Sequence, residues 1–202
     1  MRLLALPALA LLAACAAAPV PVAAPAVTPP PGSVAAPRAT APAQAVSLVN
    51  PGFESTAPGR RNDPEGWFSH QHAGEPSYNF AIDTAEPHSG LRSLRIDNVG
   101  AEPYGAISQT VDAKPYRGRT AQVSGWLRTR DSANAALTII DLANGSPLAN
   151  NFMADAPVKG TTGWKRYSIA VPVEPQAEFI EVGAMMQGKG TLWLDDVELL
   201  VR

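Results

Sequence analysis

The stretch AQVSGWLRT, residues 121–129, carries the alternation that decides the fold class. In an extended chain its small and apolar side chains share one face: Val123, Gly125 and Leu127. The opposite face carries Ser124, Trp126 and Arg128. Side chains of a β-strand alternate between the two faces with a period of two residues, so this stretch predicts a half-buried strand.

Similar short stretches recur before and after it, separated by Gly, Pro, Asn and Asp. They are SYNFAID (77–83), RSLRID (92–97), AISQTV (106–111), LTIIDLANGSPLANNF (137–152), WKRYSIAVPV (164–173), EFIEVGAMM (178–186) and LWLDDVELLV (192–201). Asn144 and Gly145 are a strong signal for a tight hairpin turn. No window keeps a helical period. About eight to ten strands without helices predict an all-β fold, a jelly-roll β-sandwich.

The N-terminus has the composition of an export signal. In MRLLALPALALLAAC, residues 1–15, one positive residue precedes an apolar run that is too short to span a bilayer. Residues 12–15, Leu-Ala-Ala-Cys, resemble the lipobox of bacterial lipoproteins. This resemblance implies cleavage before Cys15 and lipidation of Cys15. With Ala16 next, it also implies a lipid anchor in the outer membrane of the cell envelope, on its periplasmic or surface side.

Three segments follow from the composition. Residues 1–14 are the predicted signal peptide, and residues 15–45 form a Pro/Ala-rich linker. The linker has too few large apolar side chains to offset the entropy of ordering, so we expect it to be disordered. Residues 46–202 have the length of one ordinary domain. The net charge is −2 and basic residues do not cluster, so we expect no nucleic-acid partner.

Several ordered motifs of the domain resemble the galactose-binding-like jelly rolls, especially the cellulase-type carbohydrate-binding modules of families 4, 9 and 22. These motifs are LVNPGFES (48–55), PEGW (64–67), PHSGLRSLRI (87–96), QTVDAKPYRGRTAQVSGWLRT (109–129), TGWKRYSIAVPV (162–173) and LWLDDVEL (192–199). The resemblance implies a jelly roll that binds a glycan or polysaccharide and has no catalytic activity of its own.

Asp195 and Asp196 stand side by side in the last predicted strand. Strict alternation puts Asp195 on one face with Trp193, Val197, Leu199 and Val201, and Asp196 on the other with Leu192, Leu194, Glu198 and Leu200. An unpaired carboxylate on an apolar face is costly. The resemblance implies one structural calcium ion held by Glu54, the 88–93 turn, and Asp195 or Asp196. The alternative is that these carboxylates accept backbone N–H bonds and tie the two ends of the domain together without metal.

A catalytic pair is not expected, because neighbouring strand residues point to opposite faces and glycoside hydrolysis needs carboxyl groups that face each other. We therefore predict a non-enzyme. His70 and His72 are interpreted as solvated loop residues. Trp67, Trp164 and Trp193 are expected in the core.

A sugar-binding face should expose an aromatic ring with polar neighbours. Trp126 and Arg128 on the polar side of their strand are the first candidates, with Gln109 and Tyr104 beside them. For three of these residues an alternative stays open. In these alternatives Trp126 packs under a loop, Gln109 is a core amide whose hydrogen bonds are all made within the protein, and Tyr104 caps a sheet edge. The predicted function is a membrane-anchored, non-catalytic carbohydrate-binding lipoprotein. The alternative is an envelope scaffold that binds another envelope protein.

Overall fold

A computed structural model describes residues 42–59 and 63–202 of the chain. The predicted signal peptide, Cys15 and nearly all of the predicted linker lie outside the described residues. A compact unit spans Thr40–Arg202. Within the described part of the chain, no helix has both the length and the apolar character needed to cross a membrane.

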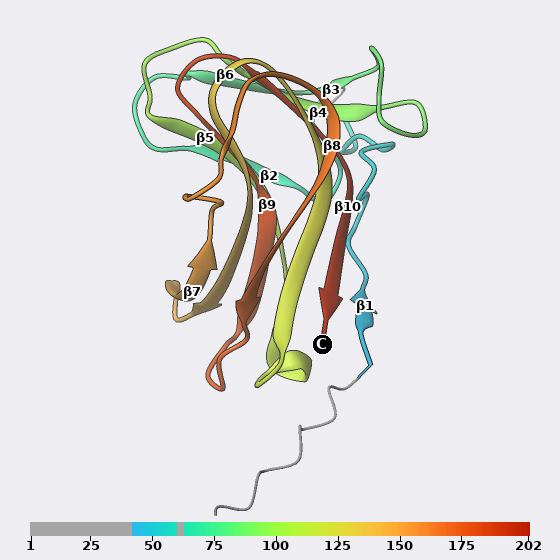
Figure 1. Ribbon diagram of the computed structural model, residues 1–202, viewed down its shortest axis with the longest axis vertical. Helices are drawn as coiled ribbons and strands as arrows, with labels where there is room; N and C mark the ends of the chain where they lie inside the picture. Colours follow the sequence, from blue (N-terminus) through green and yellow to red (C-terminus); the bar gives the residue numbers. More distant parts are fainter. Residues whose placement is uncertain (1–41, 60–62) are drawn as a thin grey trace, which may run out of the picture. The chain divides into compact units, whose positions relative to one another are not determined.

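The described residues form strands joined by loops, with one short 3-10 turn, so the predicted all-β fold is confirmed (Figure 1). The elements are β1 (Gln44–Val46), β2 (Phe68–Gln71), β3 (Tyr78–Asp83), β4 (Ser93–Asn98), β5 (Tyr104–Asp112), η1 (Lys114–Tyr116), β6 (Thr120–Ala143), β7 (Ser146–Asn151), β8 (Val158–Pro172), β9 (Phe179–Gln187) and β10 (Thr191–Val201).

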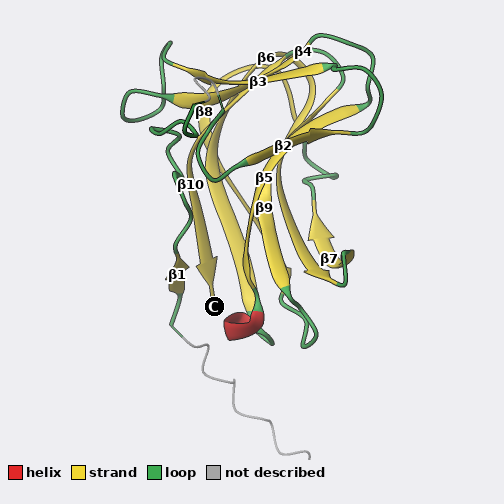
Figure 2. Cartoon of the chain, turned by 180° about the vertical axis from the view of Figure 1, so that it is seen from behind, coloured by secondary structure: helices red, strands yellow, loops and turns green. Residues whose placement is uncertain are grey.

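The long strand β6 belongs to both layers of the sandwich. Residues 120–130 of β6 pair with β10 and β8, whereas residues 134–142 pair with β9. We call the first layer sheet I, which has the order β3-β4-β10-β6-β8 with β1 beside β10. Sheet II has the order β2-β5-β9-β6-β7 (Figure 2). This arrangement of two antiparallel layers is the jelly roll that the alternation predicted.

Gly190 permits the bend at which β6 leaves sheet I and enters sheet II. A Cβ atom on Gly190 would lie 2.6 Å from Ser132 Cα and 2.7 Å from the carbonyl oxygen of Asp131. The φ angle of Gly190 is +120°, which side-chain-bearing residues rarely adopt. The bend therefore depends on a backbone approach that only glycine allows.

The core lies between the two sheets and contains apolar side chains from both. Its largest fully buried members are Phe53, Leu94, Ile96, Ile107, Leu127, Leu137, Ile139, Ile180, Met186, Leu192, Leu194 and Leu199. Trp67 packs against Phe53 with ring centroids 5.0 Å apart and donates its indole N–H to the carbonyl oxygen of Val49. Buried apolar surface of this kind is the main stabilising contribution to the fold.

A β-bulge in β10 shifts the alternation of the last strand, so the faces predicted for the residues after Asp195 are wrong. Asp195 pairs with Trp126 and Glu198 pairs with Ser124, so β10 has one residue more than β6 between these pairs. The bulge residue Asp196 has a φ of 47°. Residues on both sides of the bulge therefore point into the core: Leu192, Leu194, Val197, Leu199 and Val201. Asp195 lies on the outer face of sheet I with its cross-strand partner Trp126.

Candidate functional site

The 84–92 loop covers the outer face of sheet I beside the bulge, and Asp195 binds this loop. The Asp195 side chain has no exposed surface. Its Oδ2 accepts the backbone N–H of His88 at 3.0 Å and of Ser89 at 3.2 Å, while its Oδ1 accepts the N–H of Asp196 at 2.8 Å. These bonds supply the partners that a buried carboxylate requires.

Asp196 binds the same loop through side chains. The Nδ1 atom of His88 lies 2.7 Å from Asp196 Oδ2, and the Ser89 hydroxyl donates to Asp196 Oδ1 at 2.8 Å. The positive φ of Asp196 turns its carboxylate toward the loop, away from the strict strand alternation. Both adjacent carboxylates are therefore used to hold one loop.

Glu54 holds the other end of this loop. Its Oε1 accepts the backbone N–H groups of Leu91 at 2.8 Å and Arg92 at 3.3 Å. Gly90 lets the carboxylate come this close, because a Cβ atom on Gly90 would lie 1.9 Å from Glu54 Oε1. The first described segment and the last strand are thus joined through the 84–92 loop.

These residues do not fit a calcium ion well. Calcium takes six to eight oxygen ligands, but N–H groups and an imidazole nitrogen surround the three carboxylates. The potential metal ligands that lie within 4.8 Å of one another are His88, Asp195 and Asp196, a group that does not include Glu54. The geometry matches the alternative in which carboxylates tie the ends of the domain together. The calcium ion itself stays a prediction.

Burial perturbs the acidity of Asp195. Removal from water raises the pKa of Asp195 to about 6, and the negative charge of Asp196 adds to the rise. The N–H bonds from Ser89, Asp196 and His88 act in the opposite direction. A carboxyl group with this pKa changes its charge between mildly acidic and neutral pH.

Trp126 lies under the 84–92 loop, as one of the two alternatives proposed. The His88 ring stacks on it with centroids 3.8 Å apart and an angle of 18° between the planes. Trp164 meets the His88 ring edge-on at 5.9 Å. The Trp126 side chain is half-buried, and the His88 ring covers one of its two faces.

Arg128 lies next to Trp126 on the same face but is paired. Its Nη1 is 2.7 Å from Glu86 Oε2, and its guanidinium lies 4.9 Å from the centroid of the Trp193 ring. Trp193 is buried and donates its indole N–H to Asp83. Trp193 is therefore covered on the outer face of sheet I, outside the core between the sheets. Trp164 is only half-buried. Both positions differ from the core positions expected for these two residues.

Gln109 does not belong to this face. Only 5% of its surface is exposed, and its amide accepts the N–H of Val49 at 2.7 Å. It also donates to the carbonyl oxygens of Val49 and Gly66, both at 3.0 Å. The expectation of a ligand-contacting Gln109 is corrected accordingly, because its amide is saturated by backbone groups in the interior.

Tyr104 lies on sheet II, in a groove across the outer faces of β5, β9 and β6. The groove has a volume of about 340 Å³. Its lining comprises His70, Tyr104, Ala106, Ser108, Thr138, Ile140, Phe152, Glu181, Met185 and Gln187. Small side chains line its centre, whereas aromatic and polar ones surround them. The structure therefore separates Tyr104 from Trp126 and Arg128, which lie on sheet I.

Two exposed phenylalanines extend the aromatic character of this groove. Phe68 is 70% exposed and pairs across the strands with Ser108 of the groove lining. Phe179 is 49% exposed and alternates along β9 with Glu181 of the same lining. Directly paired residues share a face, as do alternate residues of a strand. The alternation within 178–186 indicates that Phe179 shares the outer face with Glu181. No local sequence pattern identifies Phe68 or Phe152 as residues of the groove.

Comparisons with known proteins bear on the fold. No family model and no curated protein matches the chain. Among solved structures it is similar to the apo form of a cyclase from Fischerella sp., with a TM-score of 0.59 and 14% identity over 79% of this chain and 97% of that one.

Carbohydrate-binding modules are also among the similar structures. The CBM22-1 xylan-binding domain of Xyn10C from Paenibacillus barcinonensis gives a TM-score of 0.53 and 13% identity over 74% of this chain and 90% of that one. A CBM4 structure gives a TM-score of 0.54 and 15% identity over 77% of this chain and 100% of that one. The chain thus has the jelly-roll fold of carbohydrate-binding modules, as the motifs predicted. The same fold also occurs in cyclases, so the fold alone does not separate binding from catalysis.

Proposed function

We propose that this chain is a non-catalytic carbohydrate-binding protein that holds a glycan in the groove of sheet II. The observation that carries the proposal is the gathering of aromatic side chains around a shallow groove with a small-residue centre. The aromatic residues are Phe68, Tyr104, Phe152 and Phe179. Apolar C–H faces of pyranose rings stack on aromatic rings, and a few polar groups then fix the orientation of the hydroxyls.

The polar groups that such a ligand needs are present in the same lining. Ser108 and Thr138 stand at the centre, and Glu181 and Gln187 lie further along β9. Hydroxyl and amide side chains can both donate to and accept from sugar hydroxyls, whereas a carboxylate accepts hydrogen bonds from them. A volume of about 340 Å³ falls within the usual range for small-ligand sites.

The proposal extends to the location of the protein. Its support is the lipobox-like sequence that ends at Cys15 and the Pro/Ala-rich segment that follows. Cleavage and lipidation would place the glycan-binding domain at the outer membrane, on the end of an extended tether. Metabolic labelling with a lipid precursor, compared between the parent chain and Cys15→Ser, tests this anchor.

A glycan array probed with the full-length chain tests the binding function. We expect binding of the parent to one group of glycans, with about a fivefold loss in Tyr104→Ala and in Phe152→Ala, since stacking contributes on the order of 1 kcal/mol per ring. Leu91→Ala is the matched control, because Leu91 is an exposed apolar residue of the 84–92 loop on sheet I. A folded chain that binds no glycan contradicts the proposal and favours the envelope scaffold with a protein partner.

Catalysis in the same groove is the second candidate. Its support is the presence of Glu181 and His70 in the lining, a carboxylate and an imidazole of the types that serve as general acids and bases. Incubating each glycan that binds with the parent and with Glu181→Gln, followed by product analysis, separates the two functions. Bound glycans that stay intact support binding alone, whereas turnover that Glu181→Gln abolishes supports an enzyme.

A further inference from the structure

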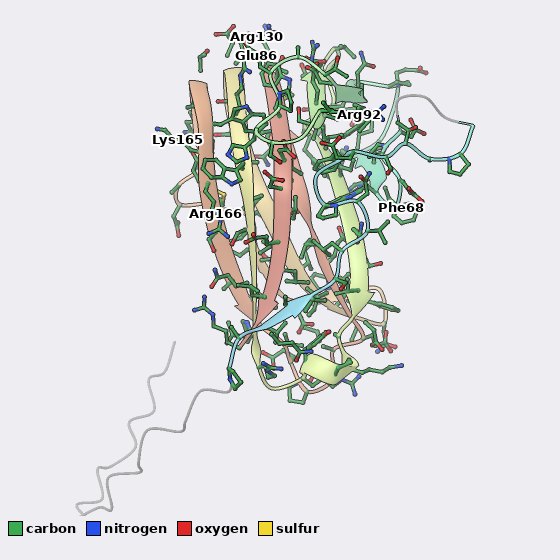
Figure 3. All side chains as sticks on the ribbon, turned by 90° about the vertical axis from the view of Figure 1, so that its right-hand side faces the viewer. Phe68, Glu86, Arg92, Arg130, Lys165 and Arg166 are labelled. Atoms are coloured by element: carbon green, nitrogen blue, oxygen red, sulfur yellow. The ribbon has the colours of Figure 1, made fainter. Side chains whose placement is uncertain are left out.

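A second groove lies on the outer face of sheet I, at the end of the sheet where β6 bends. It has a volume of about 430 Å³ and shares no lining residue with the groove of sheet II. Its principal side chains are Glu86, Arg128, Arg130, Thr162, Trp164 and Trp193. Figure 3 looks onto this side of the molecule and places Arg130 and Glu86 together at one end.

Three arginines surround the Trp193 ring beside and within this groove. The guanidinium carbons of Arg128, Arg130 and Arg95 lie 4.9, 5.5 and 5.8 Å from the ring centroid. A cation near the face of an indole is stabilised by the ring quadrupole. The buried Trp193 therefore holds a group of positive charges at this end of sheet I.

Two of these charges have carboxylate partners. Arg95 is 2.8 Å from Asp97 and 3.9 Å from Asp83, and Arg128 is 2.7 Å from Glu86. Arg130 differs, because among the residues that the structure describes no carboxylate lies within ion-pair distance of it. Its Nη2 atom donates to the Thr191 hydroxyl at 3.3 Å. The neighbouring Asp131 carboxylate accepts a bond from the Thr161 hydroxyl instead. Most of the Arg130 donor groups thus remain available in the groove.

Glu86, the partner of Arg128, is held so that its carboxylate can be replaced by another one. The backbone carbonyl of Glu86 accepts the indole N–H of Trp164 at 3.1 Å, but the Glu86 side chain is 77% exposed. An ion pair with such an exposed member contributes little to stability. A carboxylate supplied by a ligand can therefore take the place of Glu86 on Arg128, while Arg130 offers a second guanidinium fork.

The remaining lining suits a sugar ring. The half-buried Trp164 borders the groove, next to Gly163, where a Cβ atom would meet nothing within 4 Å. The hydroxyls of Thr161 and Thr162 stand on the same wall. An aromatic ring, hydroxyls, the unneutralised guanidinium of Arg130 and the exchangeable guanidinium of Arg128 form a site for a ring that has both an apolar face and a negative charge.

We propose that this groove is a second ligand site, which binds an acidic sugar through a carboxylate on Arg128 and Arg130 with the ring against Trp164. The ligand class is a glycan that contains uronic acid residues. The inference rests on the residues of sheet I alone and does not require a glycan in the groove of sheet II.

Isothermal titration of the full-length chain with trigalacturonate tests the site, with the fully methyl-esterified trisaccharide as the uncharged comparison. We expect binding of the acid to be about tenfold tighter than that of the ester, which corresponds to one charge-assisted contact. Arg130→Gln should weaken binding of the acid about tenfold. Arg130→Lys, which keeps the charge but loses the fork, should weaken it several-fold.

Lys165→Gln is the matched control, because it removes one positive charge from the same side of the molecule and Lys165 does not line the groove (Figure 3). It should leave the affinity within about twofold of the parent. Equal weakening by Lys165→Gln, equal affinity for acid and ester, or no binding by the folded parent overturns the proposal. Tyr104→Ala should bind trigalacturonate like the parent, so failure of the sheet II site and failure of this site are told apart.

Discussion

His88 stacks on Trp126 with ring centroids 3.8 Å apart, and its Nδ1 atom lies 2.7 Å from Asp196. One side chain thus joins the 84–92 loop to β6 by ring contact and to β10 by a polar contact. The residue that the sequence singles out as a sugar platform is instead part of a loop attachment. The stability of the domain and the environment of Trp126 therefore depend on a histidine in a loop.

Replacing His88 by Ala should expose Trp126 to water and shift the tryptophan emission to longer wavelength. We also expect the free energy of unfolding to fall by about 2 kcal/mol, since both the ring contact and the bond to Asp196 are lost. Urea unfolding followed by fluorescence measures both effects. His72→Ala is the control, because His72 also lies near a carboxylate, at 3.1 Å from Glu102, but its side chain is 58% exposed. Similar changes in both variants contradict a specific role for His88.

The stability should depend on pH through Asp195. Its folded pKa of about 6 lies above the value of ~3.9 expected in the unfolded chain. Between about pH 4 and pH 6 the folded protein therefore holds a proton that the unfolded chain has lost, so the contribution of Asp195 to the unfolding free energy falls as pH rises through this window. The change is on the order of 3 kcal/mol at most.

Unfolding of the parent and of Asp195→Asn at pH 5 and pH 7 checks this sign. Asn does not ionise, so the variant should lack the part of the pH dependence that favours pH 5. A parent whose stability, relative to the variant, is the same at pH 5 and at pH 7 would show that the folded pKa of Asp195 is not raised, because a carboxyl group with an ordinary or lowered pKa is already ionised in both states at pH 5.

Chelation of divalent cations should leave the domain unchanged. Because backbone N–H groups and His88 already satisfy the carboxylates, we expect the unfolding midpoint in EDTA and in millimolar calcium to agree within about 1 °C. Differential scanning calorimetry of the same sample in both buffers gives the comparison. A midpoint that rises by several degrees in calcium would establish the metal site that the family resemblance implies, with Glu54, Asp195 and Asp196 as the residues to mutate first.

Strand β9 should not tolerate a side chain at Gly183, which pairs with Ser108 and Thr138 of the sheet II groove. A Cβ atom there would lie 1.9 Å from the carbonyl oxygen of Ile107 and 3.0 Å from Ser108 Cα, so β5 and β9 would have to separate. We expect Gly183→Ala to lower the unfolding free energy by about 2 kcal/mol or more. Gly163→Ala, where a Cβ atom meets open space, should change it by less than about 0.5 kcal/mol. Equal effects in a denaturant titration would rule out close strand contact as the cause.

The strands were predictable because alternation with a period of two is a local property. It gives Ile107, Gln109 and Val111 a common face, and in the structure that face packs toward the core. Whether an inward amide is satisfied is not local, since the partners of Gln109 are 60 and 43 residues away in the chain. The sequence therefore left two readings of this residue, and only tertiary contacts decide between them.

The bulge at Asp196 was not predictable for a related reason. Strict alternation cannot include an extra residue, and the groups that hold the bulged carboxylates belong to a loop more than 100 residues earlier. The sheet II groove likewise gathers Phe68, Tyr104 and Phe152 through strand order. Alternation within one segment finds the face of a strand, but it does not show which strands lie beside each other.

The pairing of β1 with the end of β10 has a mechanical consequence. Gln44, Ala45 and Val46 lie opposite Val201, Leu200 and Leu199, so a pull on the chain before Gln44, directed along the strand, loads these pairs together in shear. Arg119 reinforces the junction by donating to Gln44 Oε1 at 3.1 Å and to the carbonyl oxygens of Pro42 and Val201 at 3.2 and 2.9 Å. If the chain before Gln44 is the tether that we propose, tension on it would be shared among several hydrogen bonds where β1 meets the sandwich.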